Sequence, residues 1–363
     1  MNQKRSKVRE QGDRKRNKNK LFIKTFLITV GVFSLLVLSG WVFMRVWVRP
    51  PDIPQITAVD LDSAASLPAE GNEEDLSVGG GLHAPEGFTS EDRKESFYTF
   101  LIVGKDEGVS MDTIMIASYD GVNETASIVG IPRDSLVNVK RRVKKINAAY
   151  AAGTLYGGGK DGGIDQLKRE IKTIIGFTPD FYVMVDLEAF VKIVDTVGGL
   201  EVDVPFDMNY DDADLHIHIR KGRQTLDGNE ALHFARYRKG NNSKDTISDY
   251  QRIENQQALI KAGLSALMKP ANLLRISDFI EIFDENVYSD IKVENMLWFA
   301  EQMSKVRGTD ALSTYTLPTI GTSGPPSYYE YLDAPSIAEL VNESINPYKK
   351  NIEVKDLDII TSG

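Results

Sequence analysis

The chain has 363 residues, of which 42% are hydrophobic and 26% are charged. This composition is ordinary for a globular protein, and it excludes both wholesale disorder and a polytopic membrane protein. The chain contains no cysteine. Disulfide frameworks, cysteine-ligated zinc and thiol catalysis are therefore excluded as well.

The charge is unevenly distributed along the chain. Nine of the first twenty residues are Lys or Arg, whereas residues 49–363 hold 32 basic and 50 acidic residues, a net charge of −18. A domain that acidic is a poor nucleic-acid binder, because neutralising phosphates requires clustered Lys and Arg. We therefore expect no nucleic acid among its partners.

An uncharged stretch of twenty residues, Thr25–Met44, follows the basic tail. A helix of that length spans about 30 Å, the thickness of the hydrocarbon core of a bilayer. A cleaved signal peptide is the main alternative, but its apolar region is shorter and ends in small residues, whereas here the stretch continues through Trp41, Phe43 and Trp47. We predict a cytoplasmic tail at 1–20, a single transmembrane helix at 21–48 and an extracellular remainder.

The next segment, 49–94, holds five of the fourteen prolines, three consecutive glycines and little apolar periodicity. This pattern predicts a flexible extracellular linker. A folded domain is expected over 95–350, followed by a C-terminal tail at 351–363.

Strand and helix patterns alternate along the predicted domain. Short β-branched and aromatic runs predict strands at Phe97–Val103, Thr113–Tyr119, Ala126–Ile131, Phe181–Val185 and Ser313–Leu317. Helical spacing predicts helices at Ile164–Ile175, Glu188–Val197, Asn229–Tyr237, Asp249–Met268, Ile276–Phe283 and Val293–Val306, and one from Ser336 onward. The expected fold class is α/β, with α-β-α layers around a mixed sheet.

Charged residues are concentrated where the predicted strands and helices end. They fall in Gly104–Asp106, Met111–Thr113, Ile131–Ser135 and Arg236–Arg238, and at the start of the helix that contains Asp249, Arg252 and Gln256. Ligand sites in α/β proteins lie where strands end and loops converge. The structural alternative is that these arginines form ion pairs with neighbouring carboxylates such as Asp134, Asp245 and Asp249.

Several of these segments resemble motifs of the LytR-CpsA-Psr (LCP) family of Gram-positive cell-envelope proteins. They are IPRDS (131–135), KKINAAYAAG (144–153), VDTVGGLEVDVP (194–205), GRQTLDGNEALHFARYR (222–238) and DYQRIENQQ (249–257), followed by TLP (316–318) and SYYEY (327–331). Each motif alone is weak, but their order and spacing make the resemblance specific over about 95–345.

The resemblance implies a membrane-anchored transferase with a layered α/β domain and an apolar pocket for a prenyl chain. Such enzymes move a teichoic acid, capsule or related glycopolymer from undecaprenyl pyrophosphate to a sugar hydroxyl of peptidoglycan. The expected location is the cell membrane of a Gram-positive envelope, and the expected partners are the lipid-linked glycopolymer, peptidoglycan and the membrane.

The resemblance also implies roles for seven residues. The metal carboxylates correspond to Asp106 and Asp112, with Mg²⁺ as cofactor and Mn²⁺ as its substitute. The catalytic arginines that bind pyrophosphate correspond to Arg133, Arg236 and Arg238; Arg252 and Gln256 complete the phosphate site. These chemistries are consistent with the residue types, because guanidinium groups bind phosphate in a bidentate fork and Mg²⁺ prefers carboxylate oxygens.

Three features depart from the family pattern: Met111 replaces the usual Arg, Asn255 replaces another, and the segment from Asp106 to Asp112 is short. They leave open a catalytically weakened LCP-like protein that binds lipid-linked polymer as an envelope regulator or scaffold. A hydrolase that transfers the phosphate to water is a further alternative.

Two other motifs are similar to known functional sites, a metal cluster and a P-loop. His216 and His218 mimic a metal cluster, but the alternation of Leu215, Ile217 and Ile219 predicts a half-buried strand instead. The run 157–160 lacks the following Ser or Thr of a P-loop, so we expect a turn before a helix.

Overall fold

The computed structural model describes residues 48–53, 84–106, 108, 110–156, 159–212, 215–241, 246–273, 275–306, 311–324 and 327–360. The basic tail, nearly all of the predicted membrane span and most of the linker lie outside these residues. Within the described part of the chain, no helix has both the length and the apolar character needed to cross a membrane. Residues 48–51 group with Glu294–Trp298, and the remaining described residues form the unit treated below.

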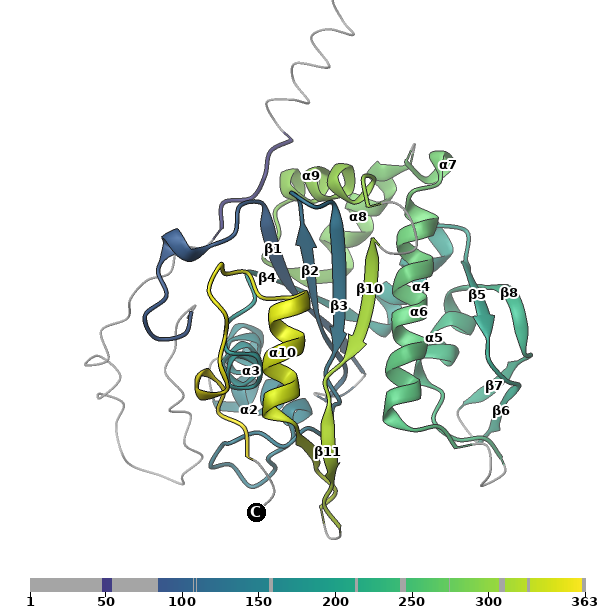
Figure 1. Ribbon diagram of the computed structural model, residues 1–363. Helices are drawn as coiled ribbons and strands as arrows, with labels where there is room; N and C mark the ends of the chain where they lie inside the picture. The colour runs from purple at the N-terminus through teal and green to yellow at the C-terminus, as the bar shows by residue number, and fades with distance from the viewer. Residues whose placement is uncertain are drawn as a thin grey trace, which may run out of the picture. The chain divides into compact units, whose positions relative to one another are not determined.

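A six-stranded mixed sheet lies at the centre of this unit (Figure 1), in the order β10-β3-β2-β1-β4-β9. Its pairs β1–β2, β2–β3 and β4–β9 are antiparallel, whereas β1–β4 and β3–β10 are parallel. The strands are β1 Phe97–Lys105, β2 Met111–Asp120, β3 Thr125–Gly130, β4 Phe181–Asp186, β9 Val287–Ser289 and β10 Leu312–Thr316. The predicted mixed α/β fold is thereby confirmed, and each predicted strand is found within one or two residues of its expected ends.

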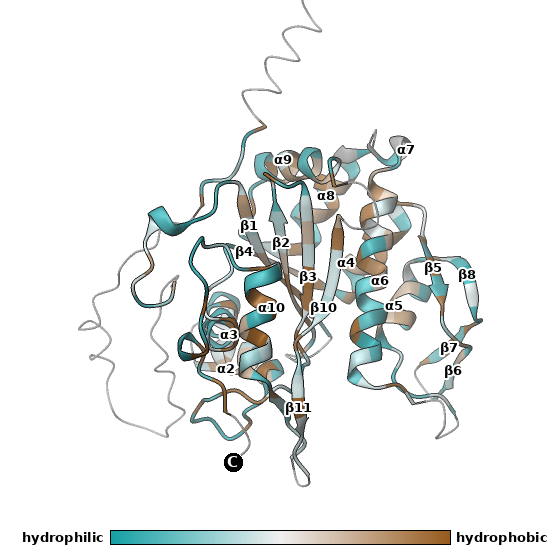
Figure 2. Ribbon diagram, viewed as in Figure 1, coloured by the Kyte–Doolittle hydropathy of each residue, from teal (hydrophilic) through white to brown (hydrophobic). Residues whose placement is uncertain are grey.

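Alternation along the strands separates two apolar cores. Leu101 and Val103 of β1 belong to one core, whereas Ile102 between them packs with Met115 and Ile128 on the opposite face. Because side chains alternate with a period of two, each face of the sheet is covered by its own helices. Figure 2 shows the apolar residues gathered along the strands and on one side of α10.

Three helices cover the first face: α2 Ala149–Tyr156, α3 Gly159–Ile175 and α10 Ala334–Ser344. The predicted apolar stripe of α3, including Ile164, Leu167 and Ile171, is fully buried there. Helices α2 and α3 approach so closely at Gly153 that an added Cβ would lie 2.2 Å from the carbonyl oxygen of Gly162. The predicted turn at 157–160 falls partly outside the described residues, and α3 begins at its Gly159.

The other face carries α4 Leu187–Thr196, α5 Gly228–Arg236 and α6 Asp249–Leu267 (Figure 1). Helix α6 crosses the end of β3 at Gly130, where an added Cβ would lie 2.3 Å from Cγ2 of Ile253. The missing side chain therefore sets how close the first turns of α6 come to the sheet. Further along the chain lie α7 Pro270–Leu273, α8 Ile276–Asn286 and α9 Val293–Met303.

Three small two-stranded sheets complete the fold. They pair β5 Leu200–Val204 with β8 Gly222–Leu226, β6 Met208–Asp211 with β7 His216–Ile219, and β11 Thr319–Thr322 with β12 Glu330–Leu332. The first two pack with α4, α5 and α6 around a third apolar core, which includes Val202, Ile217 and Phe234. Of these strands, the sequence predicted only the segment around β7.

The packed region extends beyond both predicted domain ends. Phe88, inside the predicted linker, lies edge-on to Tyr348 with ring centroids 5.1 Å apart. Ile352, inside the predicted tail, is 1% exposed, and Ile359 also packs against the first core. Short 3-10 turns occur at Ser90–Asp92, Ile146–Ala148 and Val354–Asp356.

Candidate active site

A cavity of about 370 Å³ lies between the sheet and helices α4, α5 and α6. Its apolar lining includes Ile102, Phe190, Ile193, Leu259 and Ile260. All seven residues that the sequence singled out line this same cavity: Asp106, Asp112, Arg133, Arg236, Arg238, Arg252 and Gln256. The fold therefore brings together side chains that are up to 150 positions apart in the chain.

Strand directions explain why three of these segments meet. Strand β2 runs antiparallel to β1 and pairs Thr113 with Gly104, so the end of β1 and the start of β2 lie at one edge of the sheet. Strand β3 runs back beside β2, and the amide of Ile131 donates to the carbonyl of Ile114 at 2.9 Å. Asp106, Asp112 and Arg133 therefore project from the same edge.

Helix α5 supplies two arginines because it ends between them. The helix starts at a capping box formed by Asp227 and Glu230, and its last residue is Arg236. Tyr237 then adopts a non-helical conformation (φ −56°, ψ 129°) and is 1% exposed, so that its ring is buried beside Phe206. Arg236 and Arg238 flank this buried tyrosine and both reach the cavity.

Helix α6 places a buried arginine in its first turn. Ser248 caps the helix through Gln251, and the side chain of Arg252 is only 4% exposed. One nitrogen of Arg252 pairs with Asp249 at 2.5 Å. Burial lowers the pKa of Arg252, the nearby positive charges of Arg133 and Arg238 lower it further, and Asp249 opposes both effects. Arg133 and Arg238 are thus both close enough to repel Arg252.

Several polar atoms at this mouth lack a protein partner. Among the described residues, buried Nε of Arg133, buried Nε of Arg252 and buried Oδ2 of Asp249 have no hydrogen-bond partner. Buried donors in native proteins are almost always satisfied. Two guanidinium donors in need of acceptors, beside mutually repelling charges, suit an anionic ligand.

Asp112 and Arg133, for which separate roles were predicted, contact each other directly. Nη1 of Arg133 donates to Oδ1 of Asp112 at 2.5 Å, and the two side chains are 18% and 32% exposed. Oδ1 of Asp106 accepts a hydrogen bond from the amide of Gly108 at 2.8 Å. Two carboxylates at one cavity suit a cation that keeps water and phosphate ligands, as Mg²⁺ does. The described residues contain no cluster of three or more His, Cys, Asp or Glu that would form a closed metal cage.

The expected pairing with a neighbouring carboxylate is found for Arg252, and Arg133 is also paired, with Asp112. Arg252 pairs with Asp249, whereas Asp134 pairs with Lys145 at 3.0 Å and not with an arginine. Asp245 lies outside the described residues. Within the described ranges, neither Arg236 nor Arg238 forms an ion pair.

Two of the three departures from the family pattern, Met111 and Asn255, lie away from the cavity. Met111 is fully buried in the first core, at a bulge where β1 and β2 shift register. Asn255 is 6% exposed, and its amide nitrogen has no hydrogen-bond partner among the described residues. Neither residue lines the cavity.

The sequence reading missed some lining residues. Asp186, which ends β4, lines the cavity while its carboxylate caps α4 by accepting from the amide of Ala189 at 2.8 Å. Lys105 and Thr113, which lie in the charged segments that the sequence singled out, also line it. The placement of Asp186 directly after a predicted strand was the available signal.

The histidine pair lies on the predicted strand. His216 and His218 are exposed on β7, where both lie within 3.0 Å of Oδ1 of Asp211. The pKa of Asp211 is lowered, chiefly by the hydrogen bond with His216.

Comparison with known proteins identifies relatives over most of this region. The LytR_cpsA_psr family matches residues 69–346. Among curated proteins, the polyisoprenyl-teichoic acid–peptidoglycan teichoic acid transferase TagV of Bacillus subtilis is 29% identical over 215 residues, 56% of this chain and 52% of TagV. The corresponding transferase TagU of the same organism is 26% identical over 257 residues, 69% of this chain and 78% of TagU. The chain thus spans only about half the length of the TagV relative that it matches.

Solved structures share the fold. The crystal structure of B. subtilis TagV superposes with a TM-score of 0.57 at 26% identity and covers 74% of this chain and all of that one. A structure of TagT bound to LI-WTA superposes with a TM-score of 0.53 at 20% identity and covers 76% of this chain and 96% of that one. The latter similarity supports the fold alone.

Proposed function

Because the chain belongs to the LytR_cpsA_psr family, we propose that it transfers a glycopolymer from an undecaprenyl pyrophosphate carrier to a sugar hydroxyl of peptidoglycan. The supporting observation is the convergence of four arginines and two aspartates at the mouth of one apolar cavity. The similarity to transferases named for polyisoprenyl-linked teichoic acid and peptidoglycan supports the same substrate class. The attached polymer is a teichoic acid, a capsule or a related polysaccharide.

In this proposal the apolar wall holds the prenyl chain. Burial of each CH₂ group contributes about 0.8 kcal/mol, so even a few isoprene units provide substantial affinity. The cavity of about 370 Å³ is far smaller than a whole C55 chain requires, so the distal units extend beyond it. The wall residues Phe190 and Ile193 of α4 and Leu259 of α6 need no polar partner in the lipid.

The arginines bind the pyrophosphate. The acceptor hydroxyl oxygen forms a new bond to the phosphorus that carries the polymer, and the hydroxyl proton is released to solvent. The phosphoanhydride bond breaks, and undecaprenyl phosphate leaves with the electron pair. Phosphoryl transfer depends mainly on positioning and on neutralising the charge that develops on the leaving group. Arg236 and Arg238, which have no ion pair among the described residues, are available for the phosphate oxygens, and Arg133 and Arg252 approach from other elements.

Asp106 and Asp112 are the residues that would hold Mg²⁺ or Mn²⁺ in this proposal. A divalent cation bound there neutralises part of the pyrophosphate charge. The protein supplies two carboxylates, a set that suits a magnesium ion sharing its other positions between water and phosphate. Arg133 already contacts Asp112, so this arginine and the cation address the same carboxylate.

We further propose that the enzyme acts outside the cell membrane of a Gram-positive bacterium. The basic tail keeps the N-terminus in the cytoplasm, and Thr25–Met44 spans the bilayer once. In wall-stripped cells, external protease should then digest everything after about residue 49. Protection of the C-terminal domain would refute this topology.

The test of the activity is transfer of a labelled lipid-linked saccharide to a peptidoglycan oligomer by the full chain in detergent. Asp112→Ala should abolish the dependence on Mg²⁺, and Arg238→Lys should lose most activity because the charge remains but the bidentate fork is lost. Removal of one charge-stabilising group at such a site costs about 10²–10³-fold in rate. Equal rates for Asp112→Ala and the wild type would refute the metal assignment.

The Arg133–Asp112 contact favours one alternative. If that ion pair persists with substrate present, Asp112 is not available to a cation, and the protein binds lipid-linked polymer as an envelope regulator or scaffold. Tight binding of a prenyl pyrophosphate together with no transfer under any divalent metal would support this alternative.

A further inference from the structure

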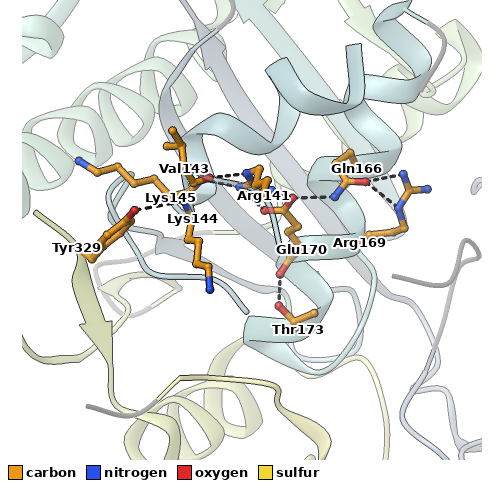
Figure 3. A network of polar contacts seen from close by, with 9 residues as sticks. All are labelled: Arg141, Val143, Lys144, Lys145, Gln166, Arg169, Glu170, Thr173 and Tyr329. Atoms are coloured by element: carbon orange, nitrogen blue, oxygen red, sulfur yellow. Dashed lines mark hydrogen bonds and ion pairs between the residues drawn. The ribbon is translucent and has the colours of Figure 1, made fainter. Parts of the chain in front are cut away.

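A buried ion pair lies behind the segment that carries Arg133. Glu170 of α3 is fully buried, and Arg141 is 6% exposed. The guanidinium of Arg141 contacts both carboxylate oxygens, with Nη2 to Oε2 at 2.8 Å, and Gln166 donates to Oε1 at 2.8 Å (Figure 3). All carboxylate contacts of Glu170 are thus made inside the protein.

The same guanidinium also holds the backbone of the loop that follows Arg133. Its Nε donates to the carbonyl of Val143 at 2.6 Å, and its Nη2 donates to the carbonyl of Lys145 at 2.7 Å (Figure 3). The loop closes on itself, because the amide of Val137 donates to the carbonyl of Lys144 at 2.9 Å. One side chain therefore fixes both the loop and its distance from α3.

The end of this loop is bonded directly to the segment of the catalytic arginine. The amide of Asn147 donates to the carbonyl of Arg133 at 3.2 Å, and the amide of Ile146 donates to the carbonyl of Ser135 at 3.0 Å. In addition, Nζ of Lys145 pairs with Asp134 at 3.0 Å. A continuous set of bonds therefore runs from Glu170 through Arg141 and Lys145 to Asp134, the residue after Arg133.

Stability alone does not account for the pair. Desolvating two charges offsets much of their attraction, and well-packed apolar replacements are often neutral or stabilising. Burial raises the pKa of Glu170, even though Arg141 and Gln166 oppose that shift. The clear consequence of the pair is geometric: Arg141 fixes one loop conformation by four hydrogen bonds that an apolar pair cannot reproduce.

We propose that Arg141 and Glu170 are positioning residues that hold the backbone of Arg133 in place for phosphate binding. The role in phosphate binding rests on the proposed function, whereas the bracing of the loop does not. Arg141 and Glu170 do not line the cavity and touch no reacting atom.

The decisive variant is the apolar double replacement Arg141→Met with Glu170→Leu in the full chain. It removes both charges together, so no unpaired charge is left buried and the melting temperature should stay near that of the wild type. Lys168→Met is the matched control, because Lys168 lies on the same helix but pairs with Asp290 at 3.2 Å. Three quantities are measured: melting temperature, amide hydrogen exchange and the kinetics of glycopolymer transfer.

We expect faster exchange at the amides of Ile146 and Asn147 in the double variant and no change in Lys168→Met. Transfer should fall about 10- to 100-fold in kcat/KM, the size of effect that a displacement of about 1 Å produces. Wild-type exchange in the double variant would overturn the proposal whatever the activity. Faster exchange with undiminished transfer would overturn it as well.

Two further outcomes are separable. If the double variant does not fold, Lys145→Met is used instead, because it breaks the contact with Asp134 without touching the buried pair. A normal melting temperature with at least a several-fold loss of transfer supports the proposal. Unchanged transfer refutes it. If the wild type itself shows no transfer, the proposed function fails, and the exchange measurement alone decides whether the pair braces the loop.

Discussion

Arg133 and a divalent cation should compete for Asp112. The side chain of Arg133 donates to Oδ1 of Asp112 at 2.5 Å, and Asp112 is also one of only two predicted metal carboxylates. Binding of the cation must therefore weaken or displace this contact. Replacing Arg133 by Met removes the competitor, so the variant should bind the cation more tightly even though it loses a phosphate ligand.

The expected size of the effect follows from the exposure of the pair. Exposed ion pairs contribute about 0.2–1 kcal/mol, and hydrogen bonds to charged groups about 1.5–3 kcal/mol. The two side chains are 18% and 32% exposed, between those cases, so the contact is worth about 1 kcal/mol. Because about 1.4 kcal/mol corresponds to a factor of ten, the affinity for the cation should rise about fivefold.

Binding of Mn²⁺ without substrate, measured by electron paramagnetic resonance, reports this affinity directly. Arg238→Met is the control, because it removes the same charge from the same cavity but has no ion pair with Asp112. Any gain in the control measures the general loss of positive charge. Equal gains in the two variants, or weaker binding in Arg133→Met, would refute the competition.

Two other predictions test the framework and the electrostatics of the mouth. Gly130→Ala should lower the free energy of unfolding in urea by about 1–3 kcal/mol, because its Cβ would meet Cγ2 of Ile253 at 2.3 Å. This cost should nearly vanish in an Ile253→Ala background. Equal costs in both backgrounds would contradict the steric explanation. Burial, Asp249 and Asp134 raise the pKa of Glu330, so the folded protein holds this proton more tightly than the unfolded chain does, and the ionised carboxylate destabilises the fold above the ordinary glutamate pKa. Glu330→Gln should therefore stabilise by up to about 0.5 kcal/mol at pH 7 and not at pH 4, whereas Glu343→Gln at an exposed position should show no such pH dependence.

The sequence predicted the sheet and its main helices because their patterns are local. The apolar stripe of α3 and the β-branched runs of β1 and β3 each satisfy a single period, and tertiary packing agrees with that period. Strands β5, β6 and β8 were not predicted. Their length does not explain this, because β7 and β10 are equally short and were predicted. The alternation of buried and exposed residues along Leu200–Val204 was an available signal.

The sequence predicted a set of residues that line one cavity, but not which of them contact one another. Motif order was sufficient to select seven residues, and the fold brings all seven to one cavity. In the structure Arg133 binds Asp112, whereas Arg236 and Arg238 have no ion pair among the described residues. These contacts depend on side-chain directions, which the spacing of residues in the sequence does not encode. The buried pair of Arg141 and Glu170 escaped for a related reason: an Arg in a basic loop and a Glu on an amphipathic helix both resemble surface residues until the loop folds over the helix.

Helix α6 contributes residues to both the apolar and the charged parts of the cavity lining. One face of α6 places Leu259 and Ile260 in the apolar wall, and two turns earlier it places Arg252 at the charged mouth. A lipid chain and its pyrophosphate are joined covalently, so a site for them needs apolar and cationic surfaces at a fixed separation, and a rigid helix provides it. The close approach at Gly130 sets the distance of this helix from the strand that leads to Arg133. Arg133, which follows β3, and Arg252 of α6 therefore keep a common spacing only while both the glycine contact and the proposed brace on the Arg133 loop are intact.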